Sequence, residues 1–140
     1  MENGMVPHEL LAKILFINKH KQEQISIAIN KLNSSKAEIA NQIKSNQGHI
    51  DGITTNLAEY KQTSYKKKLT NAQVRMIDIR KITYGMEQLR LKLAEAYKNH
   101  EQLNQEHQNI DNLILDERAK AKVLLIKEAK FEYIIDGQVA

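Results

Sequence analysis

Two histidines, His100 and His107, come closest in type and spacing to a metal-binding pair. Metal-binding histidines on one helical face usually stand four residues apart, as in the His-Glu-x-x-His motif. A spacing of seven residues separates two side chains by about 10 Å along a helix, which is too far for one ion. We therefore expect no metal site and interpret both histidines as part of a polar layer between helices.

Catalytic motifs are absent from the rest of the sequence. It contains no Gly-rich phosphate loop, no nucleophile elbow and no clustered pair of acids. Its zero cysteines exclude disulfides, thiolate catalysis and cysteine-ligated metals. We expect a protein that is not an enzyme and that needs no cofactor.

A basic segment, residues 61–81, could bind another protein. It holds seven Lys or Arg residues against one Asp, so the whole positive excess of a chain with net charge +4 lies there. Tyrosines beside a lysine cluster suit an interface anchor with electrostatic steering, although a merely solvated basic tip remains an alternative. Nucleic-acid binding is a third option, disfavoured because no stacking platform or recognised motif accompanies the charge. The residues assigned to this interface are Tyr65, Lys66, Lys67, Lys68, Arg75, Arg80 and Tyr84.

A second candidate surface is apolar and draws on both ends of the chain. Nearly every position of 10–17 is apolar, and so are 123–126 and most of 131–135. A two-helix seam buries only about two residues in seven, so this excess predicts contact with another protein. Local thickening, with the termini folding back, is the alternative. The apolar end, as we call this candidate interface, comprises Leu10, Ile14, Phe16, Ile17, Val123, Leu125, Ile126, Phe131, Tyr133 and Ile134.

These residues must be positioned by two long helices, because apolar residues recur at alternating three- and four-residue steps. Such a repeat keeps one stripe facing one partner helix and is typical of a coiled coil. The first seam runs through Leu11, Leu15, Asn18, Gln22, Ile25, Ile29, Leu32, Lys36, Ile39, Ile43, Asn46, Ile50, Ile53, Leu57 and Tyr60. The second runs through Ile79, Ile82, Met86, Leu89, Leu93, Ala96, His100, Leu103, His107, Ile110, Ile114, Glu117, Ala121, Leu124, Glu128, Phe131 and Ile135.

The seams break once, near the middle of the chain. Thr70 and Gln73 fit a capping box, which favours a second helix that starts at about residue 71. We predict one all-α domain over 1–140, a long antiparallel two-helix coiled-coil hairpin. Its helices cover about 7–63 and 71–135, and its tip covers about 64–70. One continuous helix that dimerises is the alternative, because 63–71 contains no Gly or Pro.

Glycines interrupt both predicted helices, at Gly48, Gly52 and Gly85. Each costs a helix roughly 0.5–1 kcal/mol relative to alanine. They are either simply tolerated or mark a soft point where the helices bend. No apolar run of 18 residues occurs in the sequence, so no membrane insertion is expected.

The local pattern resembles the SctO/FliJ family, which comprises YscO- and EscO-type proteins of type III secretion and flagellar FliJ. The likeness covers most of the chain and is densest in its second half. Ile-Arg-Lys-Ile at 79–82 and Met-Glu-Gln-Leu-Arg-Leu-Lys-Leu at 86–93 resemble that family's I-x-x-L-x-x-x-L stretch. Glu-Ala-Tyr follows at 95–97, and Glu-Ala-Lys-Phe-Glu at 128–132 is similar to the closing segment. Leu-Ala-Glu-Tyr-Lys at 57–61 resembles the run before the tip, whereas the apolar opening departs from the family's basic heptads.

The resemblance implies a cytoplasmic bacterial protein at the periphery of an inner-membrane export apparatus, in a virulence or flagellar system. It implies a non-enzymatic stalk that engages the homohexameric export ATPase ring and links it to the export gate protein or to chaperones. The apolar end would meet the ATPase, and the basic segment the other partner. A generic coiled-coil scaffold or tether is the alternative. A prefoldin-like chaperone is disfavoured because residues 61–71 offer no pair of strands.

Overall fold

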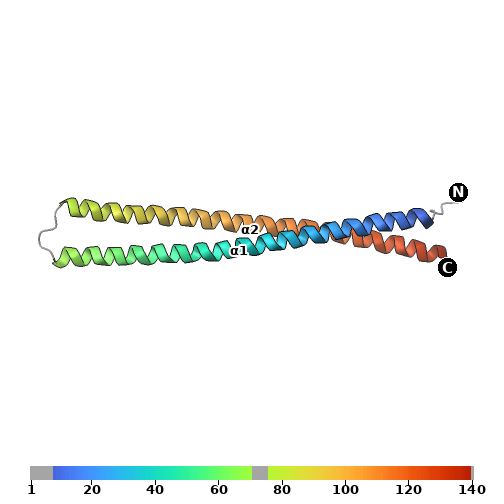
Figure 1. The fold of residues 1–140 in the computed structure, drawn as a ribbon, viewed down its shortest axis with the longest axis horizontal. Helices are drawn as coiled ribbons and strands as arrows, with labels where there is room; N and C mark the ends of the chain where they lie inside the picture. The colour runs from blue at the N-terminus through green and yellow to red at the C-terminus, as the bar shows by residue number, and fades with distance from the viewer. Residues whose placement is uncertain (1–7, 71–75, 140) are drawn as a thin grey trace. The chain divides into compact units, whose positions relative to one another are not determined.

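The computed structural model describes the backbone of residues 8–70 and 76–139 and the side chains of 8–64 and 76–137. The described backbone is entirely helical. Helix α1 (His8–Thr70) and helix α2 (Met76–Val139) pack against each other as a helical hairpin (Figure 1). This confirms the predicted all-α hairpin over the alternative of one unbroken helix.

The helix boundaries differ from those expected. Helix α1 continues to Thr70, so the segment 64–70 expected as a tip is helical, and α2 begins at Met76 rather than near 71. The first helix carries no Gly or Pro beyond Gly52, so nothing in its composition stops it earlier. The predicted capping box extends into 71–75, outside the described residues. Helix α1 also runs without a break through Gly48 and Gly52.

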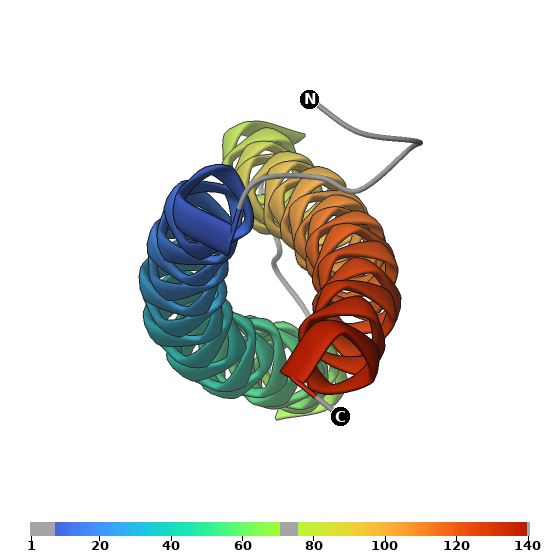
Figure 2. The same cartoon turned by 90° about the vertical axis from the view of Figure 1, so that its right-hand side faces the viewer.

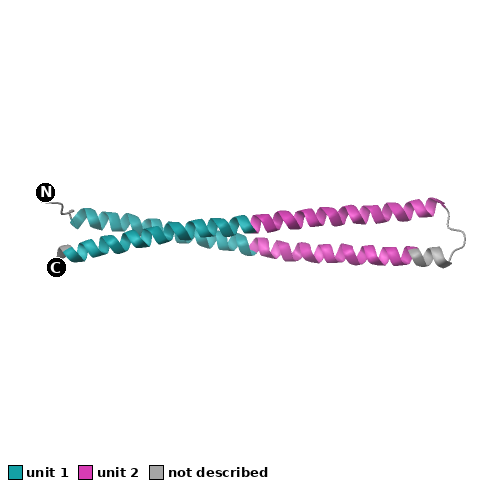
Figure 3. Ribbon diagram, turned by 180° about the vertical axis from the view of Figure 1, so that it is seen from behind, with its two compact units in different colours: residues 1–37, 108–140 teal, residues 38–107 magenta. Residues whose placement is uncertain are grey.

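The paired helices divide into two compact units (Figure 3). Unit 1 comprises 1–37 and 108–140, and unit 2 comprises 38–107. In unit 1 the start of α1 and the end of α2 lie at the same end (Figures 1 and 2). In each unit the two helices run antiparallel, because contacts that move forward along α1 move backward along α2.

The predicted seams form the core of both units. Each seam residue is buried or half-buried, whereas almost all other described positions are exposed. Few side chains are fully enclosed, because two helices cover each other along only one stripe. The residues that are buried rather than half-buried are Leu11, Asn18, Ile50, Ile53, Ala96 and Ile114.

Two asparagines show that the helices have the same register in the two units. Nδ2 of Asn18 donates to the carbonyl oxygen of Leu124 in unit 1, and Nδ2 of Asn46 donates to that of Ala96 in unit 2, each at 3.0 Å. Four heptads separate the two asparagines, and four separate the two carbonyls. A slip of one heptad would offer each donor another backbone carbonyl, so the register is selected by the side chains that pack around each asparagine.

Candidate protein interface in unit 1

Helix α1 displays the first part of the apolar end. Phe16 is 75% exposed, and Leu10 and Ile17 are also exposed, although all three belong to a helix whose seam is already buried. Ile14 is half-buried, because it lies beside the seam. Large apolar side chains left in water at the end of a helix pair are typical of a surface that binds another protein.

Helix α2 supplies the larger part. Tyr133 is 79% exposed and Ile126 is 48% exposed. Phe131 is half-buried, because it occupies a seam position. Three further exposed apolar residues of unit 1, Ile27, Leu113 and Leu115, were not predicted, although their off-seam positions would have revealed them. The other predicted residues of α2 that are exposed are Val123, Leu125 and Ile134.

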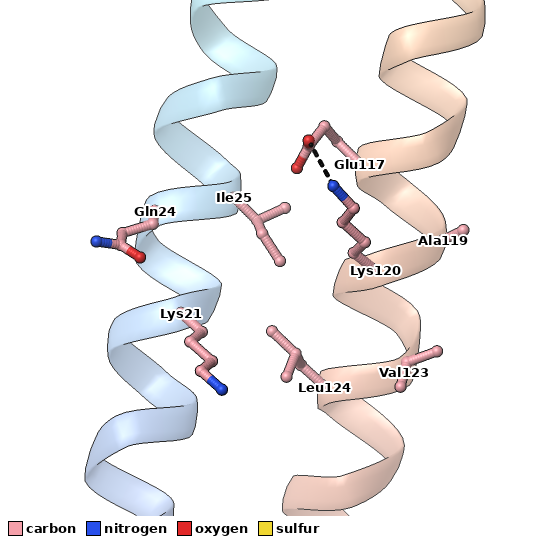
Figure 4. Close-up of a pocket in the computed structure, with 8 residues that line it drawn as sticks. All are labelled: Lys21, Gln24, Ile25, Glu117, Ala119, Lys120, Val123 and Leu124. Carbon is pink, nitrogen blue, oxygen red and sulfur yellow. Dashed lines mark hydrogen bonds and ion pairs between the residues drawn. The ribbon is translucent and has the colours of Figure 1, made fainter.

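A groove of about 580 Å³ opens between the two helices of unit 1. Figure 4 shows Ile25 and Leu124 pointing toward each other across it. At its wall Nζ of the exposed Lys120 lies 3.3 Å from Oε1 of Glu117, so a carboxylate in an ion pair occupies what the heptad repeat makes a core position. Three seam residues at this level, Glu117, Ala121 and Gln22, offer little apolar volume. The full lining is Lys21, Gln24, Ile25, Glu117, Ala119, Lys120, Val123 and Leu124.

A second hollow, of about 530 Å³, lies on α2 alone. Its walls are almost entirely apolar, and Lys130 is the one charged residue that lines it. Val123 of the groove and Ile126 of this hollow are neighbours on the outer face of α2, so the two depressions follow one helix. The lining residues of the second hollow are Ile126, Ala129, Lys130, Tyr133 and Ile134.

The candidate interface of the basic segment is described only in part. Tyr84 is 68% exposed and Arg80 is exposed, as a binding role for them requires. The side chains of Tyr65, of Arg75 and of the lysines at 66–68 lie outside the described residues. The structure therefore brings together the apolar end but leaves this second site open.

The two histidines lie at seam positions, where both are half-buried. His100 is half-buried on the seam, and its Nδ1 is a buried atom without a hydrogen-bond partner. Asp111 follows His107 by one helical turn on α2, and its Oδ1 lies 2.6 Å from Nζ of Lys36 on α1. Within 8–64 and 76–137, no three His, Cys, Asp or Glu side chains are grouped so as to hold a metal ion.

Comparison with known proteins adds no family: no family model, no curated protein and no solved structure matches the chain. Neither helix, over its described residues, contains a stretch long and apolar enough to cross a membrane. What the geometry offers is an exposed apolar surface on a helical hairpin.

Proposed function

We propose that the chain is a non-enzymatic stalk or adaptor of a type III secretion or flagellar export apparatus. In this proposal its apolar end engages the export ATPase ring, and its basic segment meets the export gate protein or a chaperone. The protein would work in the bacterial cytoplasm beside the inner membrane.

One observation carries the proposal: both helices of unit 1 expose large apolar side chains around a seam that is already buried. Phe16 on α1 and Tyr133 on α2 are each at least 75% exposed, so the pair offers apolar surface on more than one side. Apolar side chains at such an end are more stable buried in a protein collar than exposed to water. The stretches at 79–82 and 86–93 that resemble the SctO/FliJ family support an export apparatus as the assembly.

The test is reconstitution with the export ATPase of the same organism. We expect the chain to raise ATP turnover and to promote ring formation, which native mass spectrometry measures. A variant with Phe16→Glu and Tyr133→Glu should lose both effects while keeping its helical circular dichroism. No change in turnover or assembly on adding the intact chain would contradict the proposal.

A scaffold or tether in a larger helical assembly is the second candidate. It is favoured by exposed apolar residues in unit 2, away from the apolar end, such as Leu91 and Tyr97. Lateral packing against other helices would use such positions. If Leu91→Glu and Tyr97→Glu abolish assembly with the partners and the apolar-end variant does not, this second function is the correct one.

A further inference from the structure

A stripe of five residues on α2 has the periodicity of a second helix-binding seam. Its residues follow one another at steps of four, three, four and three. Each lies two positions after a residue of the α1-facing seam, which is about 200° around the helix and so on the opposite face. All five are exposed in unit 1. This outer track comprises Ala119, Val123, Ile126, Lys130 and Tyr133.

The outer track borders the α2 edge of the groove and runs through the hollow on α2. Ala119 and Val123 line the groove between the helices, and Ile126, Lys130 and Tyr133 line the hollow on α2. Depressions that follow one another along a heptad line accept side chains spaced along a facing helix. The geometry therefore selects an amphipathic helix as the occupant, in preference to a strand or a loop.

The charges around the track select the kind of helix. Three lysines line the two hollows, Lys21, Lys120 and Lys130, whereas Glu117 is the one lining acid and already contacts Lys120. Among the residues described, neither Lys21 nor Lys130 joins an ion pair. Flanking carboxylates on an incoming helix would meet these lysines, which favours association by charge complementarity.

The same lysines argue against a second copy of this chain as the occupant. Two outer tracks packed together would bring the lysines of both copies to one interface, with Glu117 already engaged. Like charges across an interface oppose pairing. We propose that the outer track binds an amphipathic helix of another protein, with apolar residues at 3.5-residue spacing and acidic residues flanking them. The inference concerns the same end of the chain as the proposed function but does not depend on an export ATPase.

The probe is a display library of 21-residue helical peptides selected against the intact chain, with no ATPase present. We expect enrichment of peptides that carry a heptad apolar stripe flanked by Asp and Glu. A selected peptide should bind at least about tenfold more weakly to a variant with Ile126→Glu and Tyr133→Glu. The control is Ala40→Glu with Ala58→Glu, which changes two exposed residues of unit 2 and should leave affinity unaltered.

The charge argument has its own control. Lys21→Glu with Lys130→Glu should weaken binding of the selected peptide by about tenfold at low salt. The same change at exposed Lys92 and Lys98 should leave its affinity unchanged. Binders without acidic flanks, or binders insensitive to the Lys21 and Lys130 changes, would overturn the proposal. So would a failure to enrich any helical binder.

Sedimentation equilibrium of the chain alone tests whether a second copy of the chain occupies the outer track. A concentration-dependent dimer that the Ile126 and Tyr133 substitutions abolish would make a second copy the occupant and would overturn an acidic partner. A monomer at all concentrations, with the selected peptide bound, supports the proposal. Since no ATPase enters either measurement, these outcomes leave the export function to its own test.

Discussion

At the scale of single residues, the three glycines that lie inside the helices have different surroundings. The ring of Tyr60 packs over Gly85, and its hydroxyl donates to the carbonyl oxygen of Lys81 at 3.4 Å. A Cβ added at Gly85 would approach Cζ of Tyr60 to 2.7 Å, whereas one added at Gly48 or Gly52 would meet nothing within 4 Å. Gly85 therefore accommodates a side chain of the facing helix, and the other two do not.

Alanine substitutions should separate these glycines. Gly48→Ala and Gly52→Ala should each raise the free energy of unfolding by roughly 0.5–1 kcal/mol, because alanine is the better helix former. Gly85→Ala should lower it by about 1 kcal/mol, because the displaced Tyr60 ring costs more than helix propensity returns. Urea denaturation measures all three. In a Tyr60→Ala background Gly85→Ala should become stabilising, and a loss of stability there would refute the steric explanation.

Replacing a seam asparagine with an apolar residue should raise the free energy of unfolding, unlike Gly85→Ala. Asn46→Leu should raise the free energy of unfolding by about 1 kcal/mol, because leucine adds apolar contact beside buried Ala96. It should also loosen the register of the two helices. The absence of cysteine makes register measurable by disulfide formation between engineered pairs. Ile53→Cys should pair with Leu89→Cys in the parent, and a slipped pairing with Ile82→Cys should gain yield in the variant.

At the scale of the helices, the polar layers of the seam differ in whether their side chains bond to the facing helix. The Asn18 layer is satisfied by a carbonyl of the facing helix and is 6% exposed. The layer at Glu117 is not closed in this way: the carboxylate turns to Lys120 on its own helix, and a groove remains. The groove beside Glu117 leaves apolar surface exposed along the pairing between α1 and α2.

Filling this layer should stabilise unit 1. Glu117→Leu should raise the free energy of unfolding by about 1–2 kcal/mol, because it buries apolar area while breaking an ion pair between partly exposed side chains. Hydrogen exchange should slow in 108–135 and remain unchanged in 80–100. Glu101→Leu, at an exposed off-seam site, is the control and should change stability little. Equal effects of the two substitutions would show that the seam position is not special.

At the scale of the whole molecule, the chain separates two kinds of surface chemistry. The positive excess is confined to 61–81, whereas exposed apolar residues gather in unit 1. Surfaces so different suit different partners, one attracted by charge and one by apolar burial. This division is the basis on which we propose an adaptor.

Reversing the charge of the lysines at 66–68 tests the basic half of that proposal. Substituting all three with Glu should weaken binding to the partner of the basic segment at low salt, with a smaller difference at high salt because ions screen the attraction. The same reversal at exposed Lys31, Lys44 and Lys92 is the control. Titration calorimetry at two salt concentrations measures the effect, and circular dichroism checks the helices. Unchanged affinity would retire the steering role.

The heptad positions by themselves determined the helices, the seam and the exposure of most of the apolar end. This was possible because a helix is periodic: the face on which Phe16 or Tyr133 lies follows from its distance to neighbouring seam residues. The end of α1 was misplaced, since no residue between 63 and 70 stops a helix.

Only the tertiary structure decided what each seam residue meets on the other helix. The pairing of Asn46 with Ala96, the ring of Tyr60 over Gly85 and the groove beside Glu117 all depend on register between segments far apart in the chain. Periodicity is a property of one helix and is unchanged by sliding its partner one heptad. Register is set by side-chain volumes and hydrogen bonds across the seam, which exist only once the helices have packed.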